Sequence, residues 1–575
     1  MEEAVGMKGA PRWLTERRGA GGPQLANEVF LQLLDNRVAA FESTSSSLQD
    51  VYTLYTKLQR FFELLAGNSS LVTLSLSPRV LHKRGELNQG AAGALRQALA
   101  SNGSLRFLTI TNVSLGTRGL LQLAAGLRHN ASLRSLTLGD VGSEGPGYVQ
   151  LFRSLSKNSA LRSLTLRPSA PVLRSLQLQE AFSQLSAALA RNSSLTHLAL
   201  HGLVRFQRDR LFSLAHNTTL LSLQLCDCDF GGPSVALSLP SIKTFSALQR
   251  LDLSDNPGLG ASWHDFALGI PYLRSLRKLR LRRCGLRTDA LAQLLPRAPL
   301  LQALALSDND LQGSAALAPL LASCAGLQEL DLSSTQIHAA QLTLLLSSVP
   351  DAEHLHSLTL NQTALGSVRL DTWTRFFLTH HLTHLSLDNA ELGDGPVLAL
   401  AETLAGGANT LQSLSLAANS IGSIGASTLF SSLQFNCSLR RLVLSSNSFD
   451  FRCIPALHKM IVSDTAALKS LALSGCFKRA SAGNALARML TTALPTELTL
   501  DHLDITNNDI GVDHLEPLLS MFRVASLSFT SLIFQPQSTI SLHQLNIFQS
   551  IADLKTANDE KRQCFLFWML VHLVW

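Results

Sequence analysis

The chain has 575 residues and a mass of 62.1 kDa, with 46% hydrophobic and 15% charged residues. This apolar content is enough to offset the entropy lost on ordering, which excludes a chain that is disordered throughout. The formal charge of +7 is small for this length and does not by itself indicate a nucleic-acid partner. Eight cysteines are too few for a disulfide scaffold, and no apolar run approaches the roughly 18 residues of a membrane span.

Two segments precede the main pattern of the chain. Residues 1–23 mix glycine, proline and arginine, and we expect them to be disordered. The first residues also contain Glu2 and Glu3 without an apolar stretch, which argues against a secretory signal and favours a cytoplasmic location. Residues 24–70 contain two amphipathic patterns, so we expect this segment to form a helical cap at the N-terminal end of the fold.

A phrase of the form Leu-x-x-Leu-x-Leu recurs sixteen times between residues 71 and 523, twice with isoleucine in the last place. Most steps between successive phrases are 25–29 residues, which fits the roughly 20–29 residues of a leucine-rich repeat. Longer steps follow Leu71, Leu161 and Leu468 and indicate insertions. The phrases begin at Leu71, Leu105, Leu133, Leu161, Leu195, Leu220, Leu248, Leu276, Leu301, Leu327, Leu355, Leu382, Leu411, Leu439, Leu468 and Leu500.

Residues 411–439 show the physics of one repeat. Leu414 and Leu416 are two apart and face one side of a short strand, while Leu429 and Leu433 are four apart and share a helix face. An asparagine three residues after the second strand leucine can bond the backbone where the strand bends away. The sequence predicts this structural role for Asn256, Asn309, Asn419, Asn447 and Asn508.

The register of these phrases resembles the ribonuclease-inhibitor-like leucine-rich repeats. The resemblance implies an α/β fold, a right-handed solenoid or horseshoe with parallel strands on its concave side and helices on its convex side. One repeat cannot cover its own leucines, but stacked neighbours can. The resemblance covers residues 71–523, about sixteen repeats.

The last part of the chain, residues 524–575, is less regular. A degenerate repeat begins at Val524, and the chain ends in an apolar run from Cys564 to Trp575. As a helix this run would be about 18 Å long, shorter than the ~30 Å hydrocarbon core of a bilayer. Three interpretations stay open: a hydrophobic capping helix, a tail that docks on a membrane surface or a partner, or a truncation artefact.

The sequence contains no motif for nucleotide binding, metalloprotease or esterase chemistry. We therefore predict no catalytic residue, no metal, no cofactor and no small-molecule substrate. Cys226 and Cys228 have the spacing of half a metal site, but no second pair matches them. Six glycosylation sequons place asparagine three residues before a repeat leucine, so the repeat explains them without secretion.

Residues that flank the inward leucines of each strand should face the concave side, where a partner would bind. Lys278, Arg280 and Arg282 alternate with leucines, and the next strand offers only alanines and a serine. We expect these three cations to form a net positive spot, either as part of a solvated face with cross-strand ion pairs or as a docking patch for an acidic protein surface. The candidate partner-binding residues are Arg250, Asp252, Lys278, Arg280, Arg282, Glu329, Asp331, His384 and Asp388.

The function predicted from these features is a non-catalytic intracellular protein-interaction scaffold. Aromatic residues are only 6% of the chain, which disfavours nucleic acid. The phrases at 330–337, 372–392 and 411–422 also resemble the CARMIL family of actin-capping-protein regulators, although no proline-rich tail follows the repeats. Two more candidate functions are a regulator of a small GTPase, similar to the Ran GTPase-activating proteins, and a sensing repeat domain similar to those of NOD-like receptors.

Overall fold

The computed structural model describes residues 40–43, 58–76, 87–142, 145–168, 177–202, 217–228, 231, 245–287, 290, 293–294, 298–312, 326–337, 339–348, 353–378, 381–405, 410–463, 465–493, 500–514, 517–518 and 531–533. The chain divides into two compact units, residues 1–276 (unit 1) and residues 277–575 (unit 2). Both units are built from the same repeat of strand, turn, helix and turn.

Unit 1 contains parallel strands, each hydrogen-bonded to the next along the chain. The register places leucine on leucine, because Leu74 pairs with Leu108 and the same position continues through every later strand. These leucines are buried, so their alternation with polar residues gives each strand one core face and one solvent face. The strands are β1 (Ala40–Ser43), β2 (Thr73–Leu76), β3 (Phe107–Thr111), β4 (Ser135–Gly139), β5 (Ser163–Arg167), β6 (His197–His201), β7 (Ser222–Cys226) and β8 (Arg250–Asp252).

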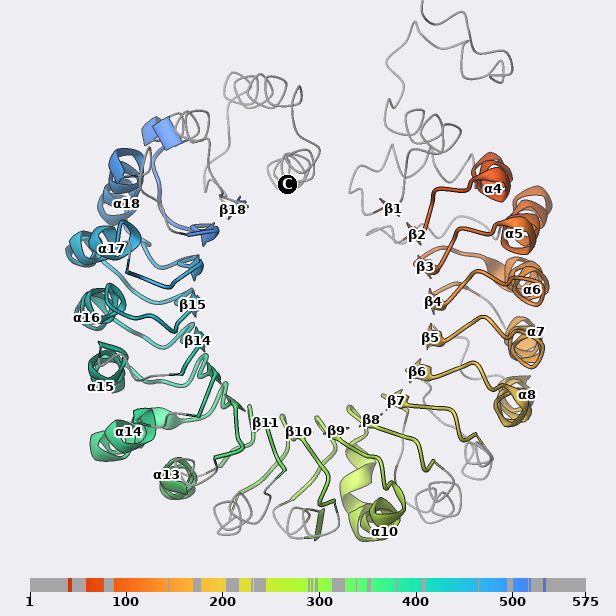
Figure 1. Ribbon diagram of the computed structural model, residues 1–575, viewed down its shortest axis with the longest axis horizontal. Helices are drawn as coiled ribbons and strands as arrows, with labels where there is room; N and C mark the ends of the chain where they lie inside the picture. The colour runs from red at the N-terminus through yellow and green to blue at the C-terminus, as the bar shows by residue number, and fades with distance from the viewer. Residues whose placement is uncertain are drawn as a thin grey trace, which may run out of the picture. The chain divides into compact units, whose positions relative to one another are not determined.

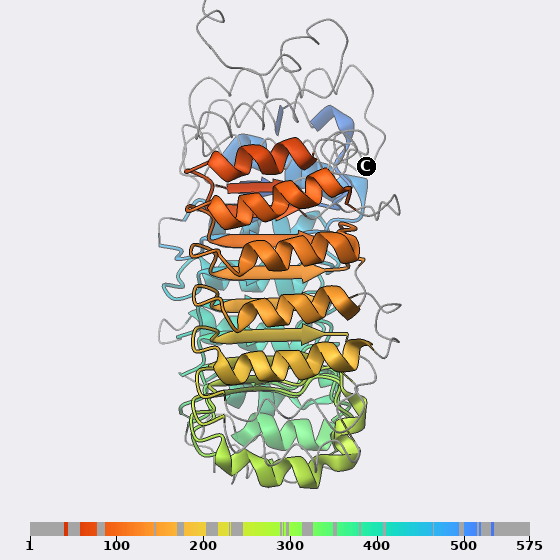
Figure 2. The ribbon, with the colours of Figure 1, turned by 90° about the vertical axis from the view of Figure 1, so that its right-hand side faces the viewer.

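The helices of unit 1 form a second layer on one side of these strands (Figure 1). Figure 2 shows the same helices stacked side by side in front of the strand layer. Their buried residues recur every three or four positions, as in α5, where Ala91, Leu95, Ala98 and Leu99 face the core. The helices are α4 (Leu58–Gly67), α5 (Gln89–Ser101), α6 (Gly116–Leu127), α7 (Gly145–Leu155), α8 (Gln177–Arg191) and α10 (Trp263–Gly269).

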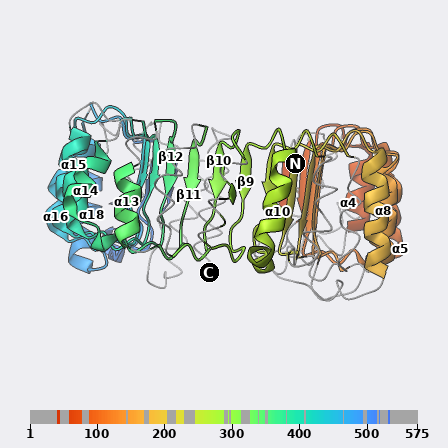
Figure 3. The ribbon, with the colours of Figure 1, turned by 90° about the horizontal axis from the view of Figure 1, so that it is seen from below.

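Unit 2 repeats this arrangement with shorter strands, all parallel and again paired in chain order. Figure 3 shows β9 to β12 lying side by side. The strands are β9 (Lys278–Arg280), β10 (Ala303–Ala305), β11 (Glu329–Asp331), β12 (Ser357–Thr359), β13 (His384–Ser386), β14 (Ser413–Ser415), β15 (Arg441–Val443), β16 (Ser470–Ala472), β17 (His502–Asp504) and β18 (Ser531–Ile533).

The helices of unit 2 bury the largest side chains of its core. In one of them Trp373 stacks on Phe377 with ring centroids 5.3 Å apart, and Phe376 contacts both rings edge to face. The helices are α13 (Ala339–Ser348), α14 (Leu370–Phe377), α15 (Asp394–Ala405), α16 (Ser423–Leu433), α17 (Ile454–Ile461) and α18 (Ala480–Ala493). The fold class predicted from the sequence, an α/β leucine-rich-repeat solenoid, is confirmed.

The two ends of the repeat pattern differ in part from the sequence prediction. Within 24–70, which was predicted to be a helical cap, α4 is a helix, but Phe41 lies in β1 and pairs with Leu74 of β2. A strand there extends the sheet, which an isolated amphipathic pattern cannot reveal. The segment 1–23 predicted to be disordered, the phrase that begins at Val524 and the apolar run at 564–575 lie outside the described residues. No helix of the described part has the length and apolar content that crossing a membrane requires.

Candidate functional site

A ladder of buried asparagines closes the turn after many of the strands, mainly in unit 2. Asn447 Nδ2 donates to the carbonyl oxygens of Leu416 (2.9 Å) and Leu444 (2.7 Å). Its Oδ1 accepts from the backbone nitrogens of Asn419 and Ile421, both at 3.0 Å. One carboxamide thus satisfies four backbone groups in two successive repeats. The five asparagines predicted to lie at such bends are all buried and all bond backbone groups: Asn256, Asn309, Asn419, Asn447 and Asn508.

A second ladder closes the turn before the strands, mainly in unit 1. Asn130 Nδ2 donates to the carbonyl of Leu99 at 2.6 Å, and its Oδ1 accepts from the backbone nitrogen of Leu133 at 2.6 Å. The equivalent asparagines of the sequons are equally buried, between 2% and 6% exposed. A carboxamide nitrogen in this position is enclosed by the backbone, which leaves no room for a glycan. The six sequon asparagines at this position are Asn68, Asn102, Asn130, Asn192, Asn217 and Asn436.

Cysteines replace asparagine at some post-strand positions and act as weaker members of the same ladder. Cys476 Sγ donates to the carbonyl of Leu444 at 3.0 Å, and Cys228 Sγ donates to that of Leu200 at 3.5 Å. Burial raises the pKa of the Cys476 thiol to about 12. A thiol that stays protonated at neutral pH is a poor nucleophile, so these cysteines are structural.

Two of the three cations expected to form a net positive spot are paired with acids, as in the first of the two alternatives, a solvated face with cross-strand ion pairs. Lys278 Nζ lies 2.9 Å from Glu329 Oε1, and Arg282 Nε lies 2.6 Å from Asp308 Oδ2. Glu329 belongs to β11 and reaches Lys278 across Ala303 of β10, which pairs with both residues in register. The small alanine leaves the space through which the two long side chains meet. The surface over β9 to β11 is therefore one of mixed charge.

Two acidic candidates are engaged at the ends of their own strands. Asp252 Oδ1 accepts from the backbone nitrogen of Ser254 at 3.0 Å and from its hydroxyl at 2.6 Å. Asp331 makes the same two bonds with Ser333, at 3.0 and 2.7 Å. Local bonds of this kind stabilise the turn that leaves the strand, so these carboxylates have a structural role. Arg250 is exposed on β8 and Arg280 is exposed on β9.

His384 and Asp388 make bonds to different partners. Asp388 Oδ1 accepts from the Ser415 hydroxyl at 2.6 Å and from the backbone nitrogen of Ala417 at 2.7 Å, which ties it to the next repeat. His384 Nδ1 lies 2.8 Å from the hydroxyl of Thr383, and the imidazole is exposed. The carboxylate therefore holds the sheet together, while the imidazole is available to a partner.

The first positions of the strands in unit 2 alternate between long and small side chains. The register runs Lys278, Ala303, Glu329, Ser357, His384, Ser413, Arg441, Ser470, His502. We call the five long side chains the projecting row: Lys278, Glu329, His384, Arg441 and His502. Four of them are exposed and Lys278 is half-buried. Neighbouring strands are about 4.8 Å apart, so the members of the row stand roughly 9.6 Å apart with small residues between them.

Sequence reasoning identified three members of the projecting row but missed Arg441 and His502. Both residues directly precede an inward leucine, Leu442 or Leu503, so the rule that selected Lys278 would also have found them. Their alternation with small residues becomes visible only when the repeats are aligned strand by strand. Within the described residues Arg441 takes part in no ion pair.

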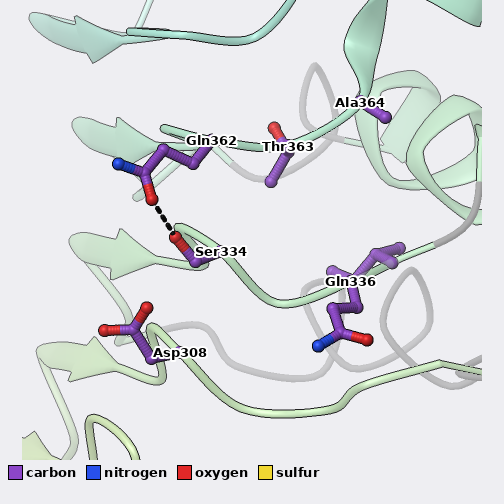
Figure 4. Close-up of a pocket in the computed structure, with 7 residues that line it drawn as sticks. Asp308, Ser334, Gln336, Gln362, Thr363 and Ala364 are labelled. Carbon is purple, nitrogen blue, oxygen red and sulfur yellow. Dashed lines mark hydrogen bonds between the residues drawn. The ribbon is translucent and has the colours of Figure 1, made fainter.

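A hollow of about 630 Å³ with a mixed polar and apolar lining lies beyond the carboxyl ends of β10 to β12 in unit 2. Figure 4 shows Asp308, Ser334 and Gln362 lining it from successive turns, with a bond of 2.7 Å from the Ser334 hydroxyl to Gln362 Oε1. At this place Thr335 and Thr363 replace the ladder asparagine, and each hydroxyl bonds a carbonyl of its own repeat. The shorter side chains interrupt the ladder here.

The described residues contain no group of histidine, cysteine, aspartate or glutamate side chains that could hold a metal ion. The ion pairs of Lys278 and Arg282 lie at the surface of unit 2, and an exposed pair contributes only about 0–1 kcal/mol to stability. What the site offers is an extended surface of hydroxyls and spaced charges, which suits a macromolecular partner.

Comparison with known proteins agrees with this geometry. A family model described as leucine-rich repeat matches residues 407–430. The mouse ribonuclease inhibitor is 28% identical over 396 residues, which cover 61% of this chain and 85% of the inhibitor. The chain is a leucine-rich-repeat solenoid that is similar to ribonuclease inhibitors. Its repeats are also 30% identical over 358 residues to NACHT, LRR and PYD domains-containing protein 12 of Mus musculus, a match that covers 60% of this chain.

This leucine-rich-repeat protein spans only 31% of the length of that NACHT protein. Among solved structures, the yeast complex of Rad7 and Elc1 is similar with a TM-score of 0.34 and 16% identity over 79% of this chain. A leiomodin-1 actin-binding site aligns with a TM-score of 0.21 over 32% of this chain.

Proposed function

We propose that this chain is a non-catalytic protein-interaction repeat domain whose binding surface is the strand face of unit 2. The observation that carries the proposal is the projecting row. Arg441 stands between Ser413 and Ser470 in register, and His384 and His502 follow on either side. Long polar side chains separated by small ones leave gaps of about two strand spacings into which a partner's side chains fit.

The charges of this face favour a polar protein partner. Glu329 and Lys278 pair with each other, which leaves Arg441 as an exposed cation with no ion pair in the described part of the chain. Arginine is enriched among the residues that dominate interface energies. Spaced charges of both signs steer encounter and select partners more than they add affinity.

The two relatives supply more specific versions of this proposal. Because the match covers 85% of the mouse ribonuclease inhibitor, one version is an inhibitor that covers a ribonuclease. This version predicts that an equimolar amount of the chain suppresses RNA hydrolysis by a pancreatic-type ribonuclease. Full ribonuclease activity in the presence of the chain would exclude this version. The NACHT relative supports the second version, a sensing repeat domain.

Direct assays separate two further functions from this proposal. Stimulated GTP hydrolysis by a Ran-type GTPase would favour a GTPase regulator, and retention of actin-capping protein on the immobilised chain would favour a CARMIL-like role. A cytoplasmic location remains part of the proposal. It is supported by the six sequon asparagines that precede a repeat leucine, whose burial disfavours glycosylation, and by the buried free thiols of Cys228, Cys284, Cys453 and Cys476.

Site-specific cross-linking tests the surface itself. A photo-reactive residue at Ser413, between His384 and Arg441 in register, should capture a partner from native lysate. The matched control is the same residue at Ser431, which is exposed on helix α16. Capture of the same protein from Ser431 but not from Ser413 would move the interface to the helix side and refute the proposal.

Removal of the projecting charges gives the complementary test. The variant His384→Ser, Arg441→Ser, His502→Ser should lose most capture at moderate salt, because three exposed contacts disappear. Its stability should be unchanged, since none of the three side chains is buried. Capture equal to that of the native chain would show that the row is not part of the interface.

A further inference from the structure

One edge of unit 1 carries cations and no acids. Four successive turns lead from a helix into a strand at residues 101–107, 128–135, 156–163 and 191–197, and none contains aspartate or glutamate. We call the six arginines and lysines of these turns the basic edge: Arg106, Arg128, Arg134, Lys157, Arg162 and Arg191. None of them forms an ion pair within the described residues.

Three arginines of the basic edge are fixed in place by the next turn. Arg106 Nη1 donates to the carbonyl of Ser132 at 2.9 Å, Arg134 Nη1 to that of Ala160 at 2.9 Å, and Arg162 Nη1 to that of Ser194 at 2.9 Å. One nitrogen of each guanidinium holds the side chain, and the remaining N–H groups keep their donor capacity. A guanidinium that is already ordered loses less entropy when it binds a carboxylate.

Arg128, Lys157 and Arg191 lie at the ends of α6, α7 and α8 and are exposed. The partial negative charge at a helix C-terminus favours cations there, which accounts for these three residues structurally. It does not account for Arg106, Arg134 and Arg162, which directly precede their strands. Two parallel rows of cations therefore follow the same edge.

An apolar contact area adjoins one end of the basic edge. Phe107 follows Arg106 and is 48% exposed, and Val72 in the preceding repeat is 38% exposed. The backbone nitrogens of Arg106 and Phe107 bond the Val72 carbonyl at 2.8 and 3.0 Å, and the register aligns Phe107 with Thr73, so Val72 lies beside Arg106 in the preceding repeat. An exposed aromatic residue next to an ordered arginine is a typical anchor of a protein interface.

We propose that the basic edge of unit 1 binds an acidic segment of a partner protein that also presents one apolar side chain to Phe107. Charge complementarity supports this occupant, because four of the six cations are exposed, Arg106 and Arg134 are half-buried, and no acid lies among them. The strands that carry the arginines are about 4.8 Å apart, close to the roughly 5–6 Å between acidic residues at i and i+4 on a helix. A single exposed aromatic side chain is no stacking platform, so single-stranded nucleic acid fits the edge less well. This surface is separate from the strand face of unit 2.

Fluorescence anisotropy on the whole chain tests the proposal with three probes. They are a labelled glutamate-rich helical peptide with one leucine, the same peptide with glutamine for glutamate, and an oligothymidylate. The glutamate peptide should bind, and its affinity should fall as salt is raised, since the Debye length is about 8 Å at 0.15 M. The glutamine peptide should bind at least tenfold more weakly. No binding of the glutamate peptide at low salt, or tighter binding of oligothymidylate, would overturn the proposal.

Three variants with the same change of charge locate the binding. The first is the triple variant Arg106→Gln, Arg134→Gln, Arg162→Gln. It should weaken peptide binding about tenfold, because three ion pairs with the peptide are lost and each contributes a modest binding free energy. If this variant does not fold, because its backbone bonds are lost, Arg128→Gln, Lys157→Gln, Arg191→Gln provides the test with exposed residues at the helix ends. The matched control is Arg96→Gln, Arg118→Gln, Arg167→Gln, three exposed cations of unit 1 outside the basic edge. An equal loss in this control would show that net charge alone attracts the peptide and would refute the site.

Discussion

Among the described residues, buried carboxamides lie mostly before the strands of unit 1 and mostly after the strands of unit 2; Asn256 of unit 1 and Asn436 of unit 2 are the exceptions. In unit 1 Asn130 closes the turn from helix to strand, and Val141 takes the place after the strand where unit 2 has an asparagine. In unit 2 Asn447 closes the turn from strand to helix, and Ala298 and Thr465 stand before strands where unit 1 has an asparagine. Either turn can thus be closed by an amide or by an apolar or small residue, and β15 has an amide at both ends, Asn436 and Asn447.

The difference between the two units extends to the surfaces proposed for binding. The ordered arginines of unit 1 follow the edge that its asparagine ladder makes rigid. In unit 2 that edge carries fewer asparagines in the described residues; Arg440 is anchored there to the Ala467 carbonyl at 3.2 Å, and further exposed charges stand on the strands themselves. Elements whose backbone hydrogen bonds are complete are already ordered before a partner binds. Charges on such elements therefore lose less conformational entropy on binding.

The largest effect should follow from breaking one ladder. Asn419→Leu removes the bonds to the carbonyls of Leu387 and Ala417 and to the nitrogen of Ala390. Buried groups left unpaired should lower the free energy of unfolding by about 3 kcal/mol, measured by urea denaturation. Ser431→Leu, at an exposed position of α16, is the control. A denaturation midpoint equal to that of the native chain would show that the ladder does not stabilise unit 2.

A smaller effect of opposite sign should follow from completing a ladder. Cys476 lies between Asn447 and Asn508 in the repeat order. Its thiol already donates to the Leu444 carbonyl and accepts from the backbone nitrogen of Asn447. Cys476→Asn should make both bonds stronger and raise the stability by about 1 kcal/mol. Cys476→Ala, which removes them, should be less stable than the native chain. If alanine were the more stable replacement, packing rather than the bonds would decide this position.

The smallest effect concerns acid sensitivity in unit 1. Burial and the charge of Arg167 lower the pKa of His201, and burial and Arg250 lower that of His197. The unfolded chain takes up protons near the usual pKa of about 6.5 while the folded chain resists them. The stability from neutral histidine is thus present above about pH 6.5 and is lost as pH falls through the lowered pKa.

We therefore expect His201→Gln to lose less stability than the native chain between pH about 7.5 and about 5.5, as measured by urea denaturation. His264→Gln, at an exposed position of α10, is the control. If the native chain and His201→Gln lost the same free energy of unfolding on acidification, His201 would not be the cause of that loss.

The sequence by itself determined the repeat, the buried leucines and the positions of the structural asparagines. These features depend on spacing within one repeat, because a strand alternates every two residues and a helix every three or four. An asparagine such as Asn419 could be placed at its bend because the bend follows from its distance to Leu416. The spacing of the leucines was therefore sufficient to predict the fold class.

Only the tertiary structure decided which charges meet and which remain exposed. Lys278 and Glu329 are 51 residues apart in the chain and meet because two strand spacings and a small alanine separate them. In the same way, the guanidinium of Arg134 finds its carbonyl at Ala160 in the following turn. Neighbours across strands depend on how repeats of unequal length stack, and no spacing within a single repeat contains that information.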